Sequence, residues 1–593
     1  MEKYLPVIME DKEKIAKTLH KLLPGLMNAL KNSKTQKEAR HNAKNYLAHI
    51  HISPARATVH NWGVICRRRL TNIMRPHNEK ESGFSTTEAL YLIAKDTKNA
   101  KNFTTAYLNE LLHIFMGISI PADRNMRPRR EFASQQKEAQ YRSSLLDGYS
   151  LGMQKHFKKF SCGLDASLAK KREKNKKKIL AYFGGSQKDW DNWLWHLRHI
   201  IKEKRVLEDL LHLNKEELAG LSLAEKKQIP FNITPYYLSL FDFNGKSEED
   251  RAIRAQVLPK KESVALISKT KDISQALDFM GERFTSPIQL ITRRYPQIVI
   301  IKPFDACPQI CQYCQRNWEL KTVGDANLPA KKKIDNAINW VAAHKSISEV
   351  LITGGDPLTL NNKILEDIIS KVAKISNVQR IRIGTRTPVT LPFRIDSGLI
   401  NILKKFHKWG EREICIVTHF EHASEITPQA LEAIKKIKNA GLNVYNQQVF
   451  TYYNSRRFET AFLRKNLKLC GIDPYYSFNT KGKEETRHFM VPISRIKQER
   501  WEEARLLPGI VRTDEPVFNI PKIGKAHLRA AGTSNRLIGL TGKGERVYKF
   551  FPWEVANPDA ESYVYTDVGI YDYLRRLEGE GEKIGDYSTI WYY

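Results

Sequence analysis

Residues 298–314 read IVIIKPFDACPQICQYC, an apolar strand-like run followed by Cys307, Cys311 and Cys314. Three thiolates at this C-x3-C-x2-C spacing suit an iron–sulfur cluster, because they can bind three irons and leave a fourth open to a ligand. A structural zinc ion would need a fourth ligand, for which a distant residue such as His419 is the candidate. Three unrelated buried thiols are the remaining interpretation, and the tight spacing after a strand disfavours it.

Short apolar runs alternate with amphipathic segments after this stretch. Strands are expected at 298–304, 349–355, 381–385, 414–420 and 442–450, and helices at 331–344, 360–375, 399–406 and 427–440. This order predicts an α/β fold built on a parallel sheet or barrel with right-handed crossovers. The chemistry of such folds lies at the carboxyl ends of the strands. The motif residues that fall there are the three cysteines, Gly354, Gly355, Asp356, His419 and Gln447.

Length and composition limit the class of protein. A chain of 593 residues is too long for one core, so we expect two to four domains. Seven cysteines are odd in number and sparse, which argues against a disulfide framework. No apolar stretch reaches about 20 residues, and the first residues lack the order of a signal peptide, so we expect a cytoplasmic protein without a membrane span.

The net charge of +32 is unevenly distributed, since residues 1–180 carry 35 Lys and Arg against 16 Asp and Glu. A basic surface attracts nucleic acid, anionic lipid or acidic substrates, although simple solvation by lysine explains the same composition. We divide the chain into a basic, mostly helical region of unknown role (1–180), a second helical region (181–290), the cysteine-bearing α/β region (291–490) and a C-terminal region with an aromatic-rich tail (491–593).

The cysteine spacing, followed one βα unit later by LITGGDPL (351–358), resembles the radical S-adenosylmethionine (SAM) superfamily. The resemblance implies a partial (β/α)6 barrel and a [4Fe–4S] cluster on the three cysteines. It also implies that SAM binds the open iron and contacts the glycine-acid motif at 354–356. In that superfamily an electron from the cluster splits SAM to a 5′-deoxyadenosyl radical, and the protein supplies binding and positioning.

From about residue 189 to 550 the chain is similar to a narrower group, the lysine 2,3-aminomutase family. The matching pieces are ITPYYLSLFD (233–242), TRRYP (292–296), the cysteine run with its arginine, LITGGDPL, RIGTRTPV (382–389), THFEH (418–422), NQQV (446–449), DPYY (473–476), HFMVPIS (488–494) and PKIGK (521–525). That family also uses pyridoxal phosphate (PLP), and it moves an α-amino group to the β-carbon of an amino acid.

The resemblance assigns roles to residues of this chain. Lys525, rather than Lys522, would hold PLP covalently at the end of the C-terminal loop. Arg294, beside Tyr295, would bind the PLP phosphate, since a fixed guanidinium suits that group. The family's second phosphate arginine is replaced by Ile298. Arg316 would pair with the substrate α-carboxylate, and the His419 and Gln447 motifs would contact cofactor.

The pattern breaks where lysine aminomutases bind the distant substrate ammonium with two aspartates. Lys481 and Asn519 stand at those positions. A lysine side chain would meet a like charge there, whereas a carboxylate could pair with Lys481 and accept a hydrogen bond from Asn519. The glutamate 2,3-aminomutase branch is similar in this exchange, so we expect conversion of L-glutamate to β-glutamate. If the loop at 521–525 is aligned with the family on Lys525 instead of Pro521, Phe518 takes the place of Asn519. Lys483, two residues after Lys481, is a second candidate for the cation that binds the substrate side chain.

Two alternatives remain at this stage. The enzyme could resemble the branch that modifies a protein-bound lysine, with its basic N-terminal region docking a macromolecule. Residues 1–180 could also form a nucleic-acid-binding module, although no recognised motif supports it. The expected partners of the enzyme are a small-molecule amino acid substrate and a reductant such as flavodoxin or ferredoxin. We also expect the chain to form a homo-oligomer.

Overall fold

The structure is a computed structural model that describes residues 7–50, 62–119, 130–245, 247–270, 277–326, 328–480, 483–530, 534–554 and 559–593. The chain forms two compact units, which we describe separately. Unit 1 comprises residues 1–152, 491–502 and 526–593, and unit 2 comprises residues 153–490 and 503–525. No helix within the described ranges is long and apolar enough to cross a bilayer.

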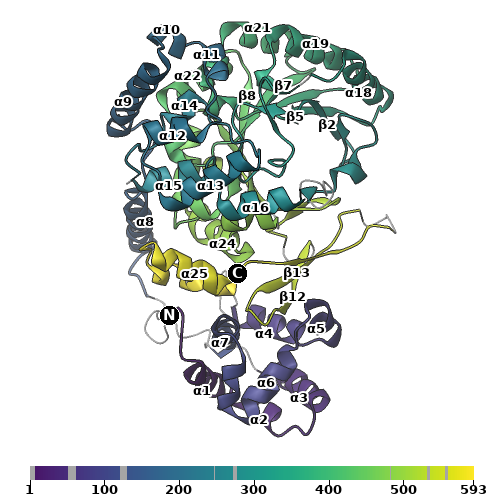
Figure 1. Ribbon diagram of the computed structural model, residues 1–593. Helices are drawn as coiled ribbons and strands as arrows, with labels where there is room; N and C mark the ends of the chain where they lie inside the picture. Colours follow the sequence, from purple (N-terminus) through teal and green to yellow (C-terminus); the bar gives the residue numbers. More distant parts are fainter. Residues whose placement is uncertain are drawn as a thin grey trace. The chain divides into compact units, whose positions relative to one another are not determined.

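Unit 1 combines N-terminal helices with a small antiparallel sheet from the C-terminal end of the chain (Figure 1). Its helices are α1 Lys12–Leu22, α2 Pro24–Lys31, α3 Gln36–His49, α4 Trp62–Ile73, α5 Pro76–Ser82, α6 Thr86–Lys95, α7 Thr105–Ser119, α24 Ile493–Gln498 and α25 Ile570–Gly579. Its strands are β12 Asn535–Leu540, β13 Arg546–Phe550 and β14 Tyr563–Thr566, paired in that order. α8 Gln135–Phe157 runs across the division at residue 152.

Proline and a buried ion pair shape unit 1. The apolar pattern at residues 11–30 predicts helix, and the structure divides it into α1 and α2 because Pro24, lacking an amide N–H, starts a new helix. Arg546 of β13 pairs with Glu110 of α7 at 3.0 Å, and both side chains are almost fully buried. This pair joins residues 436 positions apart, so it ties the two ends of the chain together within the unit.

Unit 2 is built on a curved nine-stranded sheet in the order β1-β2-β5-β6-β7-β8-β9-β10-β11. The strands are β1 Ile291–Thr292, β2 Ile298–Phe304, β5 Glu349–Gly354, β6 Arg380–Gly384, β7 Glu413–Thr418, β8 Asn443–Phe450, β9 Asp473–Asn479, β10 Glu515–Ile520 and β11 Gly524–His527. β1 is antiparallel to β2, and the pairs from β2 to β10 are all parallel. A separate two-stranded ladder pairs β3 Ala306–Cys307 with β4 Lys321–Thr322.

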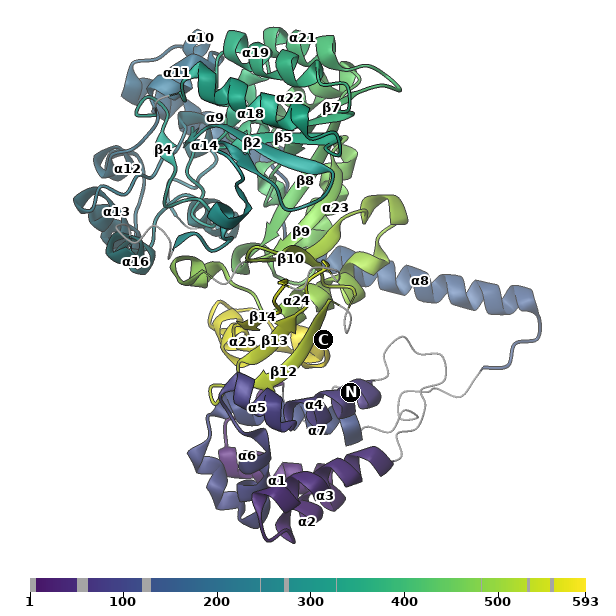
Figure 2. The same cartoon turned by 90° about the vertical axis from the view of Figure 1, so that its right-hand side faces the viewer.

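Helices follow the parallel strands and cover the outer face of the sheet, as Figures 1 and 2 show. They are α18 Lys331–Ala343, α19 Asn362–Ala373, α21 Ser397–Phe406, α22 Pro428–Asn439 and α23 Glu459–Leu469, with the short α20 Thr387–Thr390 after β6. The α/β class and the partial (β/α)6 barrel expected from the sequence are therefore confirmed. The preceding helices of the unit are α9 Ala166–Phe183, α10 Gln187–Trp190, α11 Trp193–Arg198, α12 Lys204–Leu210, α13 Lys215–Lys226, α14 Pro235–Leu238, α15 Glu248–Ala255 and α16 Lys261–Thr270.

Side chains along the strands point alternately to the packed core and to the inner face of the sheet. Ile352 of β5 and Ile383 of β6 are fully buried in the core cluster of the unit. Their neighbours Leu351, Thr353 and Arg382 point to the other face and line a cavity. Successive side chains of a strand face opposite sides, so one set of residues holds the helices while the other set forms the site.

Replacing Ile383 with alanine tests this core. The change removes a fully buried branched side chain from a central strand, so we expect unit 2 to lose about 2–5 kcal/mol of unfolding free energy in urea denaturation. Leu469→Ala is the matched control, because that side chain is 77% exposed and its loss should cost less than about 0.5 kcal/mol. Equal losses for the two variants would contradict the assignment of the core.

Candidate active site

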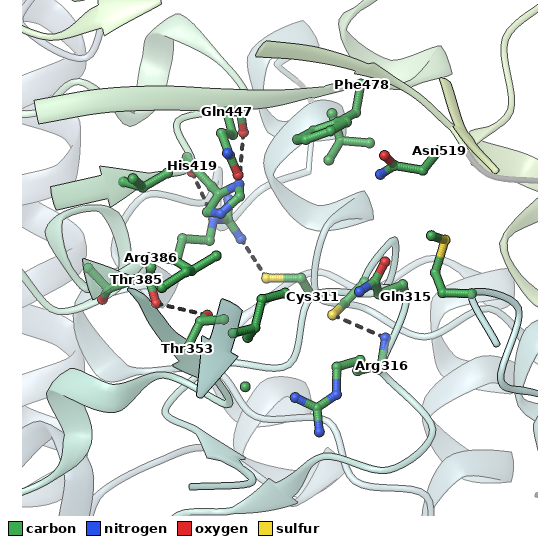
Figure 3. A pocket seen from close by; sticks show the side chains of 18 of the residues that line it. Cys311, Gln315, Arg316, Thr353, Thr385, Arg386, His419, Gln447, Phe478 and Asn519 are labelled. Atoms are coloured by element: carbon green, nitrogen blue, oxygen red, sulfur yellow. Dashed lines mark hydrogen bonds between the residues drawn. The ribbon is translucent and has the colours of Figure 1, made fainter. Parts of the chain in front are cut away.

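A cavity of about 370 Å³ opens on the inner face of the sheet, entirely within unit 2 (Figure 3). Its lining includes every site residue expected from the sequence except Lys481, which lies outside the described residues. The thirteen that line it are Arg294, Tyr295, Cys307, Cys311, Cys314, Arg316, Gly354, Gly355, Asp356, His419, Gln447, Asn519 and Lys525. Segments more than 200 positions apart in sequence thus meet at one place.

The three cysteines enter the cavity from the loop that begins at β3. Burial raises the pKa of Cys307 well above its ordinary value, and Asp356 and the other two thiols raise it further. Burial also raises the pKa of Cys311, while Arg386 opposes that effect. Thiolates gathered in a buried place need a positive group to compensate them, which is what a bound metal centre supplies.

The cysteine loop is not arranged as a compact site for one ion. Within the described residues, no group of three His, Cys, Asp or Glu side chains is arranged to hold a metal ion. Thiolates of a cluster can stand farther apart, because each binds a different iron. The zinc alternative, with His419 as the fourth ligand, finds no support in this arrangement of the described residues.

The glycine-acid motif packs directly against the cysteine loop. A Cβ atom on Gly355 would lie 2.3 Å from the carbonyl oxygen of Ala306, so a side chain cannot fit there. Asp356 is buried; it accepts hydrogen bonds from the Thr385 hydroxyl at 2.6 Å and from the Arg386 amide at 2.9 Å. Its carboxylate therefore braces the loop after β5 against the loop after β6, and Gly355 permits the close approach of the cysteine loop.

His419 and Gln447 are joined across neighbouring strands. His419 Nδ1 lies 2.8 Å from the carbonyl oxygen of Gln447, which can only accept, so the ring donates from Nδ1 and presents Nε2 as an acceptor. Burial, together with the neighbouring Arg386, lowers the pKa of His419 to about 4. The imidazole is therefore neutral near pH 7 and can accept a hydrogen bond from a ligand.

Lys525 sits at the start of β11 between two aromatic rings. Its Nζ is 5.0 Å from the Tyr295 ring centroid and 5.1 Å from that of Tyr476, and its backbone N–H donates to Tyr295 Oη at 2.6 Å. Burial, with Arg382 and Arg294 nearby, lowers the pKa of Lys525 to about 8. A lysine with a depressed pKa supplies the neutral amine that a carbonyl cofactor requires.

The neighbouring lysine is placed differently. Lys522 has a φ of 61° and holds its Nζ 4.4 Å from the ring of Phe284, a side chain that is 76% exposed. It is not among the described residues that line the cavity. Gly524 has a φ of 106°, and a Cβ there would meet Tyr295 Oη at 2.4 Å. The loop geometry thus turns Lys525, and not Lys522, toward the inner face of the sheet.

Two buried arginines have donors that no described group satisfies. Nε and Nη2 of Arg294 and Nη1 of Arg316 have no hydrogen-bond partner among the described residues. Arg294 Nη2 lies 3.6 Å from Glu282, while Arg316 Nε pairs with Glu319. An unsatisfied buried donor costs about 1–3 kcal/mol, so these groups fit the phosphate and carboxylate oxygens of bound anions.

The structure separates the residues that compete for the far end of the cavity. Asn519 lines the cavity (Figure 3). Phe518 is fully buried and is not among the described lining residues. Lys483 is buried against Glu485 at 2.6 Å and donates to the carbonyl of Gln315 at 3.1 Å. Lys483 is not among the described residues that line the cavity, and its charge is paired with Glu485 instead of facing the cavity.

Four charged residues of the described lining were not singled out from the sequence: Glu282, Lys302, Arg382 and Arg386. Lys302 projects from β2 and pairs with Glu282 at 2.7 Å. Burial alone would raise the pKa of Glu282. The nearby cations Lys302, Arg316 and Arg294 outweigh that effect and hold the pKa below its ordinary value. Arg386, at the end of β6, contacts Cys311. A lysine within the apolar run IVIIKPF was a signal that could have identified Lys302, whereas nothing local marks Glu282.

Comparison with known proteins places these features in a family. The Radical SAM superfamily model matches residues 301–465, from β2 into α23. The chain is 36% identical to glutamate 2,3-aminomutase of Clostridioides difficile, over 56% of this chain and 75% of that protein. It is 35% identical to L-lysine 2,3-aminomutase of Bacillus subtilis, over 52% of this chain and 62% of that protein.

A longer match extends the comparison beyond the barrel. An uncharacterized KamA family protein of Methanocaldococcus jannaschii is 42% identical over 545 residues, covering 88% of this chain and 87% of that protein. An alignment that covers 88% of this chain must include part of residues 1–180. The alignments with the two aminomutases cover 56% and 52% of the chain and need not include that region. On this evidence the chain belongs to the KamA family of radical SAM proteins.

Proposed function

We propose that this protein is a radical SAM, PLP-dependent 2,3-aminomutase that converts L-glutamate to β-glutamate. The observation that supports it most is the convergence of the cysteine motif, Lys525 and two unsatisfied buried arginines on one cavity. Cluster, SAM, PLP and a small amino acid each find matching residues there. The family relationship to both glutamate and lysine 2,3-aminomutases supports the reaction class.

The cluster and PLP are assigned to residues that suit their chemistry. Cys307, Cys311 and Cys314 would hold a [4Fe–4S] cluster, Lys525 would hold PLP, and Arg294 would bind its phosphate. When bound, the cluster and SAM supply a 5′-deoxyadenosyl radical able to remove an unactivated hydrogen, and PLP supplies a conjugated system that carries the migrating amino group. The chain's own residues bind these groups, orient them and exclude water.

The charges of the cavity favour an acidic substrate. The basic side chains among its described lining residues are Arg294, Lys302, Arg316, Arg382, Arg386 and Lys525. The carboxylates of that described lining are Glu282 and Asp356, and both have partners within the chain. Four of the cations also pair with carboxylates of the chain: Lys302 with Glu282, Arg316 with Glu319, Arg382 with Glu349 and Arg386 with Glu425. The ammonium of a substrate lysine would find no uncommitted carboxylate in the described lining, and this supports a second carboxylate, rather than an ammonium, on the substrate.

Two residues orient the substrate in this proposal. Arg316 would pair with the α-carboxylate through its Nη1, which has no described partner. Asn519 would donate from its amide to the side-chain carboxylate at the other end of the cavity. Lys481 remains the proposed counter-charge, on the basis of its sequence position alone. Fixing both ends of a small substrate places its β-carbon at one point, which is what positional catalysis requires.

The identity of the PLP lysine can be tested by borohydride reduction. We expect reduced PLP on Lys525 in the wild-type protein. Lys525→Ala should lose the visible absorbance of lysine-bound PLP, because the other lysine of the described lining, Lys302, is held by Glu282 at 2.7 Å. Lys522→Ala is the matched control and should retain it. Peptide mass spectrometry that finds the label on Lys522 would contradict the assignment.

The pH dependence of PLP capture follows from the environment of Lys525. Only the neutral amine attacks the cofactor aldehyde, so with a pKa of about 8 the capture rate should rise with pH and level off above about 9. An ordinary lysine would still gain rate beyond pH 10. Arg382→Gln removes a nearby cation and should move the midpoint upward. A rate that climbs unchanged to pH 10 in stopped-flow absorbance measurements would refute the depressed pKa.

The acidic-substrate proposal predicts the effect of charge at position 519. Asn519→Asp would set a carboxylate against the substrate side chain, and we expect kcat/KM for glutamate to fall at least about tenfold, equivalent to 1.4 kcal/mol. Asn401→Asp makes the same change on the exposed surface of α21 and should have no effect. Anaerobic assays that give product from lysine, and none from glutamate or aspartate, would overturn the substrate assignment.

A further inference from the structure

Arg386 joins the end of β6 to the cysteine loop. Its side chain lines the cavity and is only 8% exposed. Nη1 donates a hydrogen bond to Cys311 Sγ at 2.9 Å, and Figure 3 shows the guanidinium directed at that sulfur. The residue therefore places a positive charge against one of the three thiolates that we assign to the cluster.

The remaining donors of Arg386 fix its orientation. Nε donates to the carbonyl oxygen of His419 at 3.1 Å, and Nη2 donates to Gln256 and to Glu425 Oε1, the latter at 2.7 Å. Its backbone N–H donates to Asp356 at 2.9 Å. A guanidinium bound on several sides cannot turn away from Cys311 without breaking buried hydrogen bonds.

Glu425 provides the counter-charge and is itself held in place. It is fully buried, and its Oε1 also accepts from the Tyr237 hydroxyl at 2.7 Å. Its other oxygen accepts from the backbone amides of Glu421 at 2.7 Å and His422 at 3.2 Å. The charges thus stand in a fixed series, from the carboxylate through the guanidinium to the thiolate.

We propose that Arg386 is a positioning residue that sets the reduction potential of the cluster held by Cys311, and that Glu425 limits its effect. This role rests on the proposed cluster site. When a low-potential one-electron carrier gives one electron to the cluster, the cluster gains one negative charge. A charged hydrogen bond to a ligating sulfur stabilises that reduced state more than the oxidised one, so it raises the potential. Glu425 acts in the opposite direction because it offsets the guanidinium charge.

Opposite shifts in two variants would show this role. In redox titrations of reconstituted protein followed by electron paramagnetic resonance, Arg386→Gln should lower the ratio of reduced to oxidised cluster at a fixed potential by about tenfold, a shift of about 59 mV for one electron. Glu425→Gln should raise that ratio, because the guanidinium is then uncompensated. Arg386→Lys keeps the charge and should fall between Arg386→Gln and the wild type.

Arg394→Lys is the matched control. Arg394 is also a buried arginine after β6, but its donors go to the carbonyls of Leu358 at 2.8 Å and Leu360 at 3.1 Å, away from the cysteines. The reduction potential of the cluster in Arg394→Lys should equal that in the wild type.

The outcomes separate this role from the cluster assignment. Wild-type protein that forms no [4Fe–4S] cluster would overturn the site and with it the role of Arg386. Clusters that form in all variants, with potentials that do not move or that move in the same direction, would overturn the role of Arg386 alone. If Arg386→Gln fails to assemble a cluster, two other results decide the question: a potential above that of the wild type in Glu425→Gln and a potential below it in Arg386→Lys.

Discussion

Parallel pairing from β2 to β10 is the constraint on which the site depends. Strands that run in one direction end at one edge, so the loops after them converge whatever their distance in sequence. The cysteine loop, the glycine-acid motif, Arg386 and His419 follow successive strands of that sheet. Asn519 enters from β10 and Lys525 from β11. A slip of one residue in any strand would exchange its cavity-lining and core-facing side chains.

Charge is the second organising feature of the cavity. Most of its buried cations pair with carboxylates of the chain, as Lys302 does with Glu282 and Arg386 with Glu425, and the donors left over are costly unless anions complete the pairs. The proposed ligands are anionic at the points where the described chain leaves donors unsatisfied: a phosphate for Arg294 and a carboxylate for Arg316. The same surroundings keep His419 neutral and depress the pKa of Lys525. One electrostatic environment therefore serves anion binding and amine activation together.

Sequence periodicity was sufficient for five strands of the nine-stranded sheet, β2 and β5 to β8, because the alternation of strands with amphipathic helices is encoded locally. Strand 298–304 coincides with β2, and the helices expected between strands are present within a few residues. The residues that were missed act through neighbours distant in sequence: Glu282 meets Lys302, and Arg386 meets Cys311. The packing of residues 526–593 with residues 1–152 had no local signal either, since their partners lie at the opposite end of the chain.

The most direct test of a shared cavity follows the substrate hydrogen. Anaerobic protein would be incubated with a reductant, SAM, PLP and glutamate carrying deuterium on its β-carbon, and SAM and 5′-deoxyadenosine would be analysed by mass spectrometry. If the cluster, PLP and an acidic substrate meet in this cavity, deuterium should appear on the 5′ carbon and β-glutamate should form. Unlabelled 5′-deoxyadenosine without β-glutamate would show that glutamate does not reach the radical.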